Sequence, residues 1–191
     1  MKSVQIARAH VCFAVVLAFS CIPGTAHAFA AGAPICEVNT LPLTEMSPTL
    51  ANPAPTGWTL VAERVVYVPG QAIGLNIRNN NPAKLARGIL IWSKSGPSVG
   101  AGQFLLEAKG MFQVIPAPAQ CGEWAISHVD STPKTQSQLQ FDWMPPVQGT
   151  VIVRAFIIED CAQPMGGCRA HQALTPVLVL QPALFVDGFE D

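Results

Sequence analysis

The chain has 191 residues, of which 50% are hydrophobic and only 12% are charged, and its formal net charge is −1 at pH 7. This composition is too apolar for a disordered chain and too weakly charged for a nucleic-acid-binding surface. The length suits one ordinary domain, and we expect one.

The N-terminus predicts a secretory signal peptide over residues 1–28. Lys2 and Arg8 provide a positive start, Val11 to Ile22 form an apolar core, and Ala26-His27-Ala28 provides the small residues of a cleavage site. Removal of this segment takes away two basic residues and no acidic one, which leaves 9 basic and 12 acidic residues and a formal charge of −3. A polyanionic partner is therefore not expected.

Two weaker alternatives remain for this N-terminal segment. A retained membrane anchor is disfavoured because Pro23-Gly24 ends the apolar run well short of the ~20 residues that a span requires. A lipoprotein acylated at Cys21 is disfavoured because Ala18-Phe19-Ser20 matches the usual acylation motif poorly. We expect export, to the extracellular space or the periplasm, with no membrane span after cleavage.

Residues 29–57 are predicted to be an extended lead-in that is tied down at Cys36. Prolines prevent a helix there and disfavour a central strand. They stand at Pro34, Pro42, Pro48, Pro53 and Pro55.

From Trp58 onward the pattern becomes that of β-strands. Ile73, Leu75 and Ile77 alternate with polar or small residues and should share one buried face. In Leu85–Ser93, by contrast, both faces look buried, and Thr150–Ile158 is the most β-branched run and should lie at a sheet centre. The further strand candidates are Trp58–Glu63, Val65–Val68, Gln103–Ala108, Met111–Ile115, Cys121–Val129 and Gln138–Trp143.

About eight short strands, with no helical period in the mature chain, predict an all-β antiparallel sandwich of two sheets. A closed barrel is the alternative. Tryptophans are usually core residues in such a sandwich, although they could line a ligand groove. They are Trp58, Trp92, Trp124 and Trp143.

Four cysteines remain after signal removal, and in an exported chain they suggest two disulfides. Sequence alone permits three pairings. Cys161 and Cys168 enclose a short, flexible loop that can close on itself, which leaves Cys36 to pair with Cys121. A zinc site would need two close cysteine pairs, and the sequence has one.

Several short motifs in a fixed order resemble the Reeler (reelin) domain over about residues 36–160. The motifs are Tyr67–Gly70, Ala86–Trp92, Gly110–Ile115, Cys121, Ile126–Lys134, Phe141–Pro146 and Gly149–Ile157. The resemblance, which extends to bacterial and insect-defence-type members, implies an immunoglobulin-like β-sandwich over residues 58–160. Residues 161–191 would then be a C-terminal disulfide loop and an acidic tail.

Two positions depart from the family pattern. Many members have a cysteine where this chain has Thr150, so the pairing of Cys161 with Cys168 does not follow from the resemblance. The segment Met46-Ser47-Pro48 resembles the opening motif of the family but lacks the histidine that often follows it. Any function that depends on that histidine is not expected here.

The sequence shows no catalytic pattern. His128 and Asp130 would face the same side of an extended chain and are the candidate ligand contacts, but a lone histidine at a strand end is more often a satisfied surface group. Glu159 and Asp160 have no acid partner at a suitable spacing, and the motifs of hydrolases, zinc proteases and phosphate-binding loops are missing.

We therefore predict a secreted, non-enzymatic binding module without a cofactor, whose loops engage an extracellular protein or glycan. Two alternatives follow from the resemblance. The chain could be an accessory to a redox or metal system, because related modules accompany reductases, or a defence protein that binds microbial envelopes.

Overall fold

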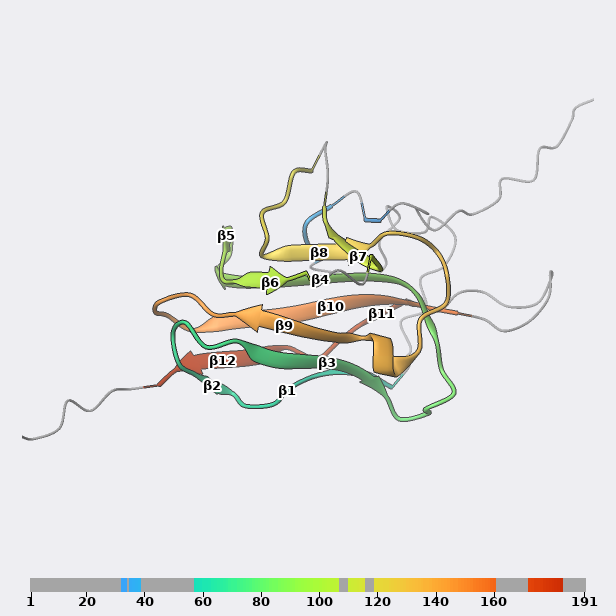
Figure 1. The fold of residues 1–191 in the computed structure, drawn as a ribbon, viewed down its shortest axis with the longest axis horizontal. Helices are drawn as coiled ribbons and strands as arrows, with labels where there is room; N and C mark the ends of the chain where they lie inside the picture. The colour runs from blue at the N-terminus through green and yellow to red at the C-terminus, as the bar shows by residue number, and fades with distance from the viewer. Residues whose placement is uncertain are drawn as a thin grey trace, which may run out of the picture.

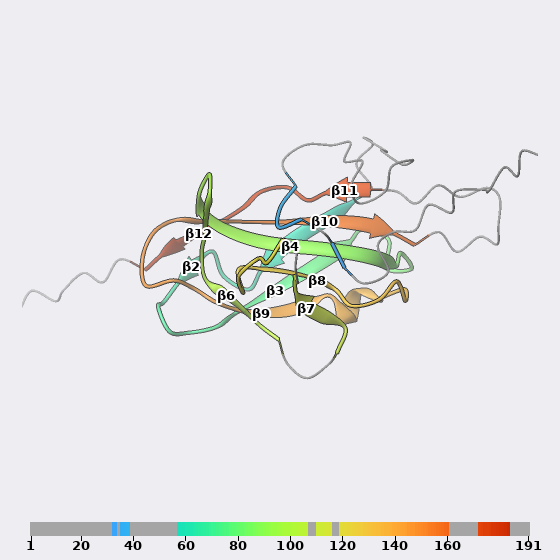
Figure 2. The same ribbon diagram turned by 90° about the horizontal axis from the view of Figure 1, so that it is seen from above.

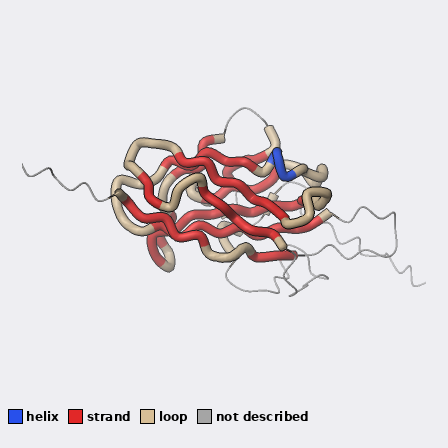
Figure 3. The backbone as a smooth tube through the Cα atoms, turned by 90° about the horizontal axis from the view of Figure 1, so that it is seen from below, coloured by secondary structure: helices blue, strands red, loops and turns tan. Residues whose placement is uncertain are grey.

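The computed structural model describes residues 32–33, 35–38, 57–106, 110–115, 119–160 and 172–183. The predicted signal peptide, most of the lead-in, the pair Cys161 and Cys168, and the acidic tail lie outside the described residues. Strands dominate the described chain, and a single 3-10 turn at Gln136–Gln138 (η1) is the helical element among these residues (Figure 3).

The smaller of two sheets has four strands in the order β1-β3-β9-β6, and all its pairs are antiparallel. Each strand alternates buried and more exposed residues, as expected for a sheet with one face on the core. The strands are β1 (Trp58–Ala62), β3 (Ile73–Asn79), β9 (Gln140–Met144) and β6 (Gln103–Leu105).

The larger sheet runs β2-β12-β10-β4-β8-β7, with β11 paired to β10 and β5 paired to β4 (Figure 1). β10 lies at its centre, as predicted. The strands are β2 (Val66–Tyr67), β4 (Ala86–Gly96), β5 (Val99–Gly100), β7 (Phe112–Val114), β8 (Ala125–His128), β10 (Val151–Glu159), β11 (Gln172–Leu174) and β12 (Leu178–Pro182).

The prediction of an all-β sandwich is confirmed, with two differences in detail. The strands outnumber the predicted eight, partly because β11 and β12 fall beyond residue 160, in the part assigned to a loop and tail. The pair β12–β2 is also parallel, whereas all other pairs of named strands are antiparallel.

The main core lies between the two sheets. Ile73, Leu75 and Ile77 of β3 are fully buried there, as the alternation predicted, and Ile89 and Ile91 of β4 face them. Burying each such side chain contributes about 1.5–3 kcal/mol. This layer holds the sheets together.

A second apolar cluster covers the opposite, outer face of the large sheet. Leu90 and Trp92 of β4 lie there beside Phe156 of β10, together with the N-terminal residues Ala33 and Val38. The N-terminal residues described by the structure are the blue trace above β4 in Figure 2. The central strands β4 and β10 are therefore buried on both faces, which explains their nearly continuous apolar sequences.

Trp143 sits in the main core against the backbone of Gly102. A Cβ at Gly102 would lie 2.4 Å from the indole ring, and the φ of +72° there also favours glycine. The indole Nε1 donates to Ser93 Oγ at 3.0 Å, and Ser93 Oγ donates to the Ala101 carbonyl at 2.6 Å. The buried indole N–H of Trp143 thus has a hydrogen-bond partner.

One disulfide joins Cys36 to Cys121, which confirms that part of the predicted pairing. It attaches the segment 35–38 to the loop before β8, so that this segment stays on the outer face of the large sheet.

Replacing both Cys36 and Cys121 by Ala should lower the free energy of unfolding by about 2–4 kcal/mol, because the bond closes a long loop, with a sequence separation of 85. Urea denaturation of the oxidised protein and the double variant measures the difference. Adding reductant to the double variant isolates any contribution of Cys161 and Cys168. A loss below about 0.5 kcal/mol for the double variant would contradict the expectation.

Candidate functional site

A pocket of about 340 Å³ opens on the outer face of the large sheet, beside the part covered by residues 32–33 and 35–38. Its lining combines apolar and charged side chains. The lining residues are Glu37, Trp92, Lys94, Gly96, Pro97, Ile152, Arg154 and Val177.

The floor of the pocket comes from alternate positions of the two central strands. Trp92 and Lys94 of β4 point outward, and in the antiparallel register Trp92 is opposite Arg154 while Lys94 is opposite Ile152. Residues with even numbers on both strands thus share this face, and their odd-numbered neighbours fill the main core. The strand pairing places two cations and two large apolar groups side by side.

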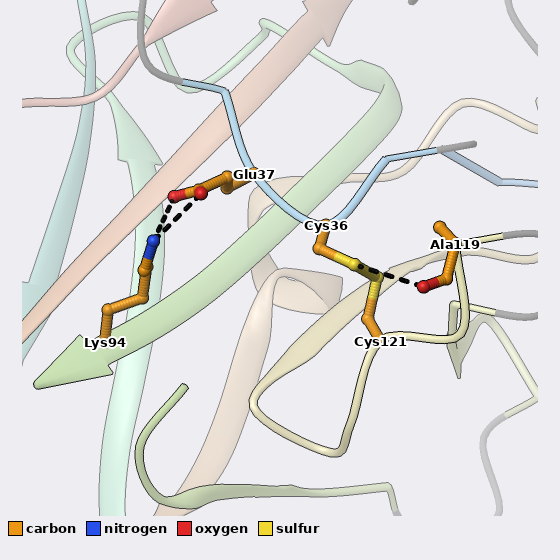
Figure 4. The surroundings of a disulfide bond; sticks show 5 residues. All are labelled: Cys36, Glu37, Lys94, Ala119 and Cys121. Atoms are coloured by element: carbon orange, nitrogen blue, oxygen red, sulfur yellow. Dashed lines mark hydrogen bonds and ion pairs between the residues drawn. A yellow bond between two sulfur atoms is a disulfide. The ribbon is translucent and has the colours of Figure 1, made fainter. Parts of the chain in front are cut away.

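Glu37, in the segment 35–38, forms one wall of the pocket. Cys36 is held by Cys121, with its Sγ atom 3.8 Å from the Ala119 carbonyl oxygen, and the next residue, Glu37, points to Lys94 (Figure 4). Both carboxylate oxygens of Glu37 accept from Lys94 Nζ, at 2.9 and 2.7 Å. The disulfide therefore positions the carboxylate that neutralises Lys94.

Arg154 has a different environment from Lys94. Its Nη2 donates to the Thr175 carbonyl at 3.5 Å, and its buried Nε atom has no hydrogen-bond partner. Burial lowers the pKa of the guanidinium from its ordinary value, because a partly dry environment disfavours the charged form. Arg154 is not among the site residues predicted from the sequence, although a cation in an otherwise apolar central strand is a signal that marks it.

The predicted candidates His128 and Asp130 lie in different environments. His128 is 1% exposed, so the expectation of a surface histidine is wrong. Its Nδ1 lies 3.0 Å from both the amide nitrogen and the carbonyl oxygen of Ile89, and 3.2 Å from Ser127 Oγ. The ring packs against the backbone of Gly88, which lacks a side chain that would separate them.

Asp130 instead organises an exposed loop. Its Oδ1 accepts from the Thr132 amide at 2.9 Å and from Lys134 Nζ at 3.3 Å. Lys134 is only 2% exposed and also donates to the carbonyl oxygens of Asp130 and Thr132, at 2.9 and 2.8 Å. The hydrogen bond from the Thr132 amide is the main reason that the pKa of Asp130 is lowered, and the Thr132 hydroxyl and Lys134 add to it.

Three of the four tryptophans are core residues, as predicted, and one is partly exposed. Trp58, Trp92 and Trp143 are at most 3% exposed, while Trp124 is half-buried. Trp92 is a buried residue of the outer cluster and also lines the pocket.

Within the described ranges, no group of three His, Cys, Asp or Glu residues could hold a metal ion. No helix in this part of the chain is long and apolar enough to cross a bilayer.

Solved structures with a similar fold include Reeler domains. The crystal structure of the human F-spondin reeler domain is 17% identical, with a TM-score of 0.52, over 68% of this chain and 90% of that chain. The Reelin-N domain of F-spondin is 18% identical with the same TM-score, over 68% of this chain and 88% of that chain. No family model and no curated protein matches the sequence.

The pKa shift of Asp130 makes a prediction about acid stability. Because its folded-state pKa lies below the unfolded value, the carboxylate stabilises the fold above the unfolded pKa, and that contribution disappears as pH falls through the folded pKa. The variant Asp130→Asn should therefore lose less stability than the native protein between about pH 6 and about pH 2.

Urea denaturation at several pH values measures this difference. Ser131→Ala is the matched control, because it alters the same loop without removing a titrating group. Parallel pH profiles for the native protein and Asp130→Asn would show that this carboxylate makes no pH-dependent contribution.

Proposed function

The chain has the fold of a Reeler domain, and we propose that it is an exported, non-enzymatic binding module that takes its ligand in the pocket on the outer face of the large sheet. The pocket carries the proposal, because it combines an apolar floor with a few polar groups in the manner of ligand sites. Its position on two central strands makes it a rigid site.

Two features support export. The Cys36–Cys121 bond is of a kind that persists in oxidising compartments and is rare in the reducing cytosol. The N-terminal sequence matches a secretory signal through residue 28.

The polar loop organised by Asp130 and Lys134 is a rigid surface feature that could add a second contact with a partner.

A blocking variant tests whether the pocket is the binding site. Val177→Trp should fill the pocket from its rim, because Val177 is 49% exposed and lines it. Val61→Trp is the matched control, since Val61 is also exposed (39%) but lies on β1 of the other sheet.

The measurement is a thermal-shift screen of a small-molecule library containing neutral, anionic and cationic compounds, on the mature protein with its disulfide intact. Compounds that bind the native protein should stabilise it. Their affinity should fall at least about tenfold in Val177→Trp and stay unchanged in Val61→Trp.

Two outcomes would count against the proposal. Hits that bind all three proteins equally would place binding outside the pocket. Saturable binding of copper, iron or haem, with no pocket-dependent organic ligand, would favour the redox or metal alternative instead.

A further inference from the structure

The charge of Arg154 is not balanced by any residue that the structure describes. The ion pairs among the described residues join Lys84 to Glu159, Arg87 to Asp160, Lys94 to Glu37 and Lys134 to Asp130, and none involves Arg154. A guanidinium has five N–H donors, and with the residues described here Arg154 makes one long hydrogen bond, to the Thr175 carbonyl.

Because Arg154 is partly buried, its unpaired charge and unmet hydrogen-bond donors cost free energy. The Nε atom of Arg154 is shielded from solvent and has no acceptor, and an unsatisfied buried donor carries a desolvation penalty. The other cation of the pocket, Lys94, is buried, and it donates to both oxygens of Glu37 and to the Pro97 carbonyl. Arg154 is therefore the group that gains most from an added anion.

The charges of the pocket also define how much negative charge it can accept. The described lining residues include two cations, Lys94 and Arg154, and one anion, Glu37, so their formal charge is +1. A single carboxylate neutralises this charge. A dianion such as a phosphate monoester would need a second free cation, and Lys94 is already paired.

The rest of the described lining is apolar and suits an uncharged hydrocarbon group attached to that carboxylate. Trp92, Pro97, Ile152 and Val177 line the pocket, and Val179 stands opposite Ile152 in the strand register, 41% exposed. A hydrocarbon group could thus continue from the pocket along β12. The volume of about 340 Å³ is at the low end of the ~300–1,000 Å³ typical of small-ligand sites.

We propose that the pocket binds a small monocarboxylate with an apolar body, with the carboxylate paired to the guanidinium of Arg154 and the body against Trp92 and Ile152. This inference rests on the proposed function, because it names the ligand class of the same site. Arginine suits the role because its planar N–H groups match a carboxylate.

Isothermal titration calorimetry with matched probes tests the proposal. Octanoate and phenylbutyrate supply a straight-chain and an aromatic body, their primary amides replace the carboxylate by a neutral group of the same shape, and octyl phosphate supplies a dianion. For the native protein we expect each carboxylate to bind at least about tenfold more tightly than its amide, the size expected for a charge-assisted hydrogen bond.

Two variants locate the preference. Arg154→Gln should abolish the difference between carboxylate and amide while leaving amide binding in place, and Arg78→Gln, an exposed arginine on β3, should retain the difference. Val177→Trp should weaken both classes of probe. The comparison of carboxylate with amide in the native protein is decisive even if Arg154→Gln folds poorly.

The outcomes separate this inference from the proposed function. Equal binding of carboxylate and amide that is still lost in Val177→Trp would overturn the ligand class and leave the pocket as the binding site. Tighter binding of octyl phosphate than of octanoate would also overturn it. Failure of every carboxylate to bind the native protein would reject the inference, while the library screen decides the proposed function independently.

Discussion

The antiparallel pair of β4 and β10 is the constraint on which the rest of this structure depends. The pair runs for most of the length of both strands, and side chains are buried on both of its faces. A central strand buried on both sides needs apolar cover above and below it. One cover is the four-stranded sheet, and the other must come from elsewhere in the chain.

That second cover comes from residues 32–33 and 35–38, the described part of the N-terminal segment, which pairs with no strand. These residues contribute Ala33 and Val38 to the outer cluster, and the Cys36–Cys121 bond keeps them there. A hydrogen bond from the Ala33 amide to Ser127 Oγ at 2.8 Å adds a polar attachment. The pocket lies beside this cover, and Glu37 forms part of its wall.

Charged groups near the core illustrate how burial and pairing are balanced. Glu159 is 2% exposed, and it accepts from Trp58 Nε1 at 3.0 Å and pairs with Lys84. Lys134 is equally buried and bonds three oxygen atoms. Both satisfy the rule that a buried charge needs several partners. Arg154 departs from that rule, and it does so in the floor of the pocket that we propose as the ligand site.

The sequence by itself determined the fold class and most of the strands before residue 160 with their buried faces, because alternation of apolar residues reports which side of a strand is buried. It did not predict β11 and β12, which lie in the part assigned to a loop and tail. It also indicated the Cys36–Cys121 bond, since a short loop favoured the other two cysteines as partners. Only the tertiary structure decided the site. Periodicity does not say which strands become neighbours, so it could not bring Arg154 beside Trp92, or Glu37 to Lys94 across 57 residues. For the same reason His128, which looked like a surface group at a strand end, became buried once β8 paired with β4 and β7 and placed the imidazole over Gly88.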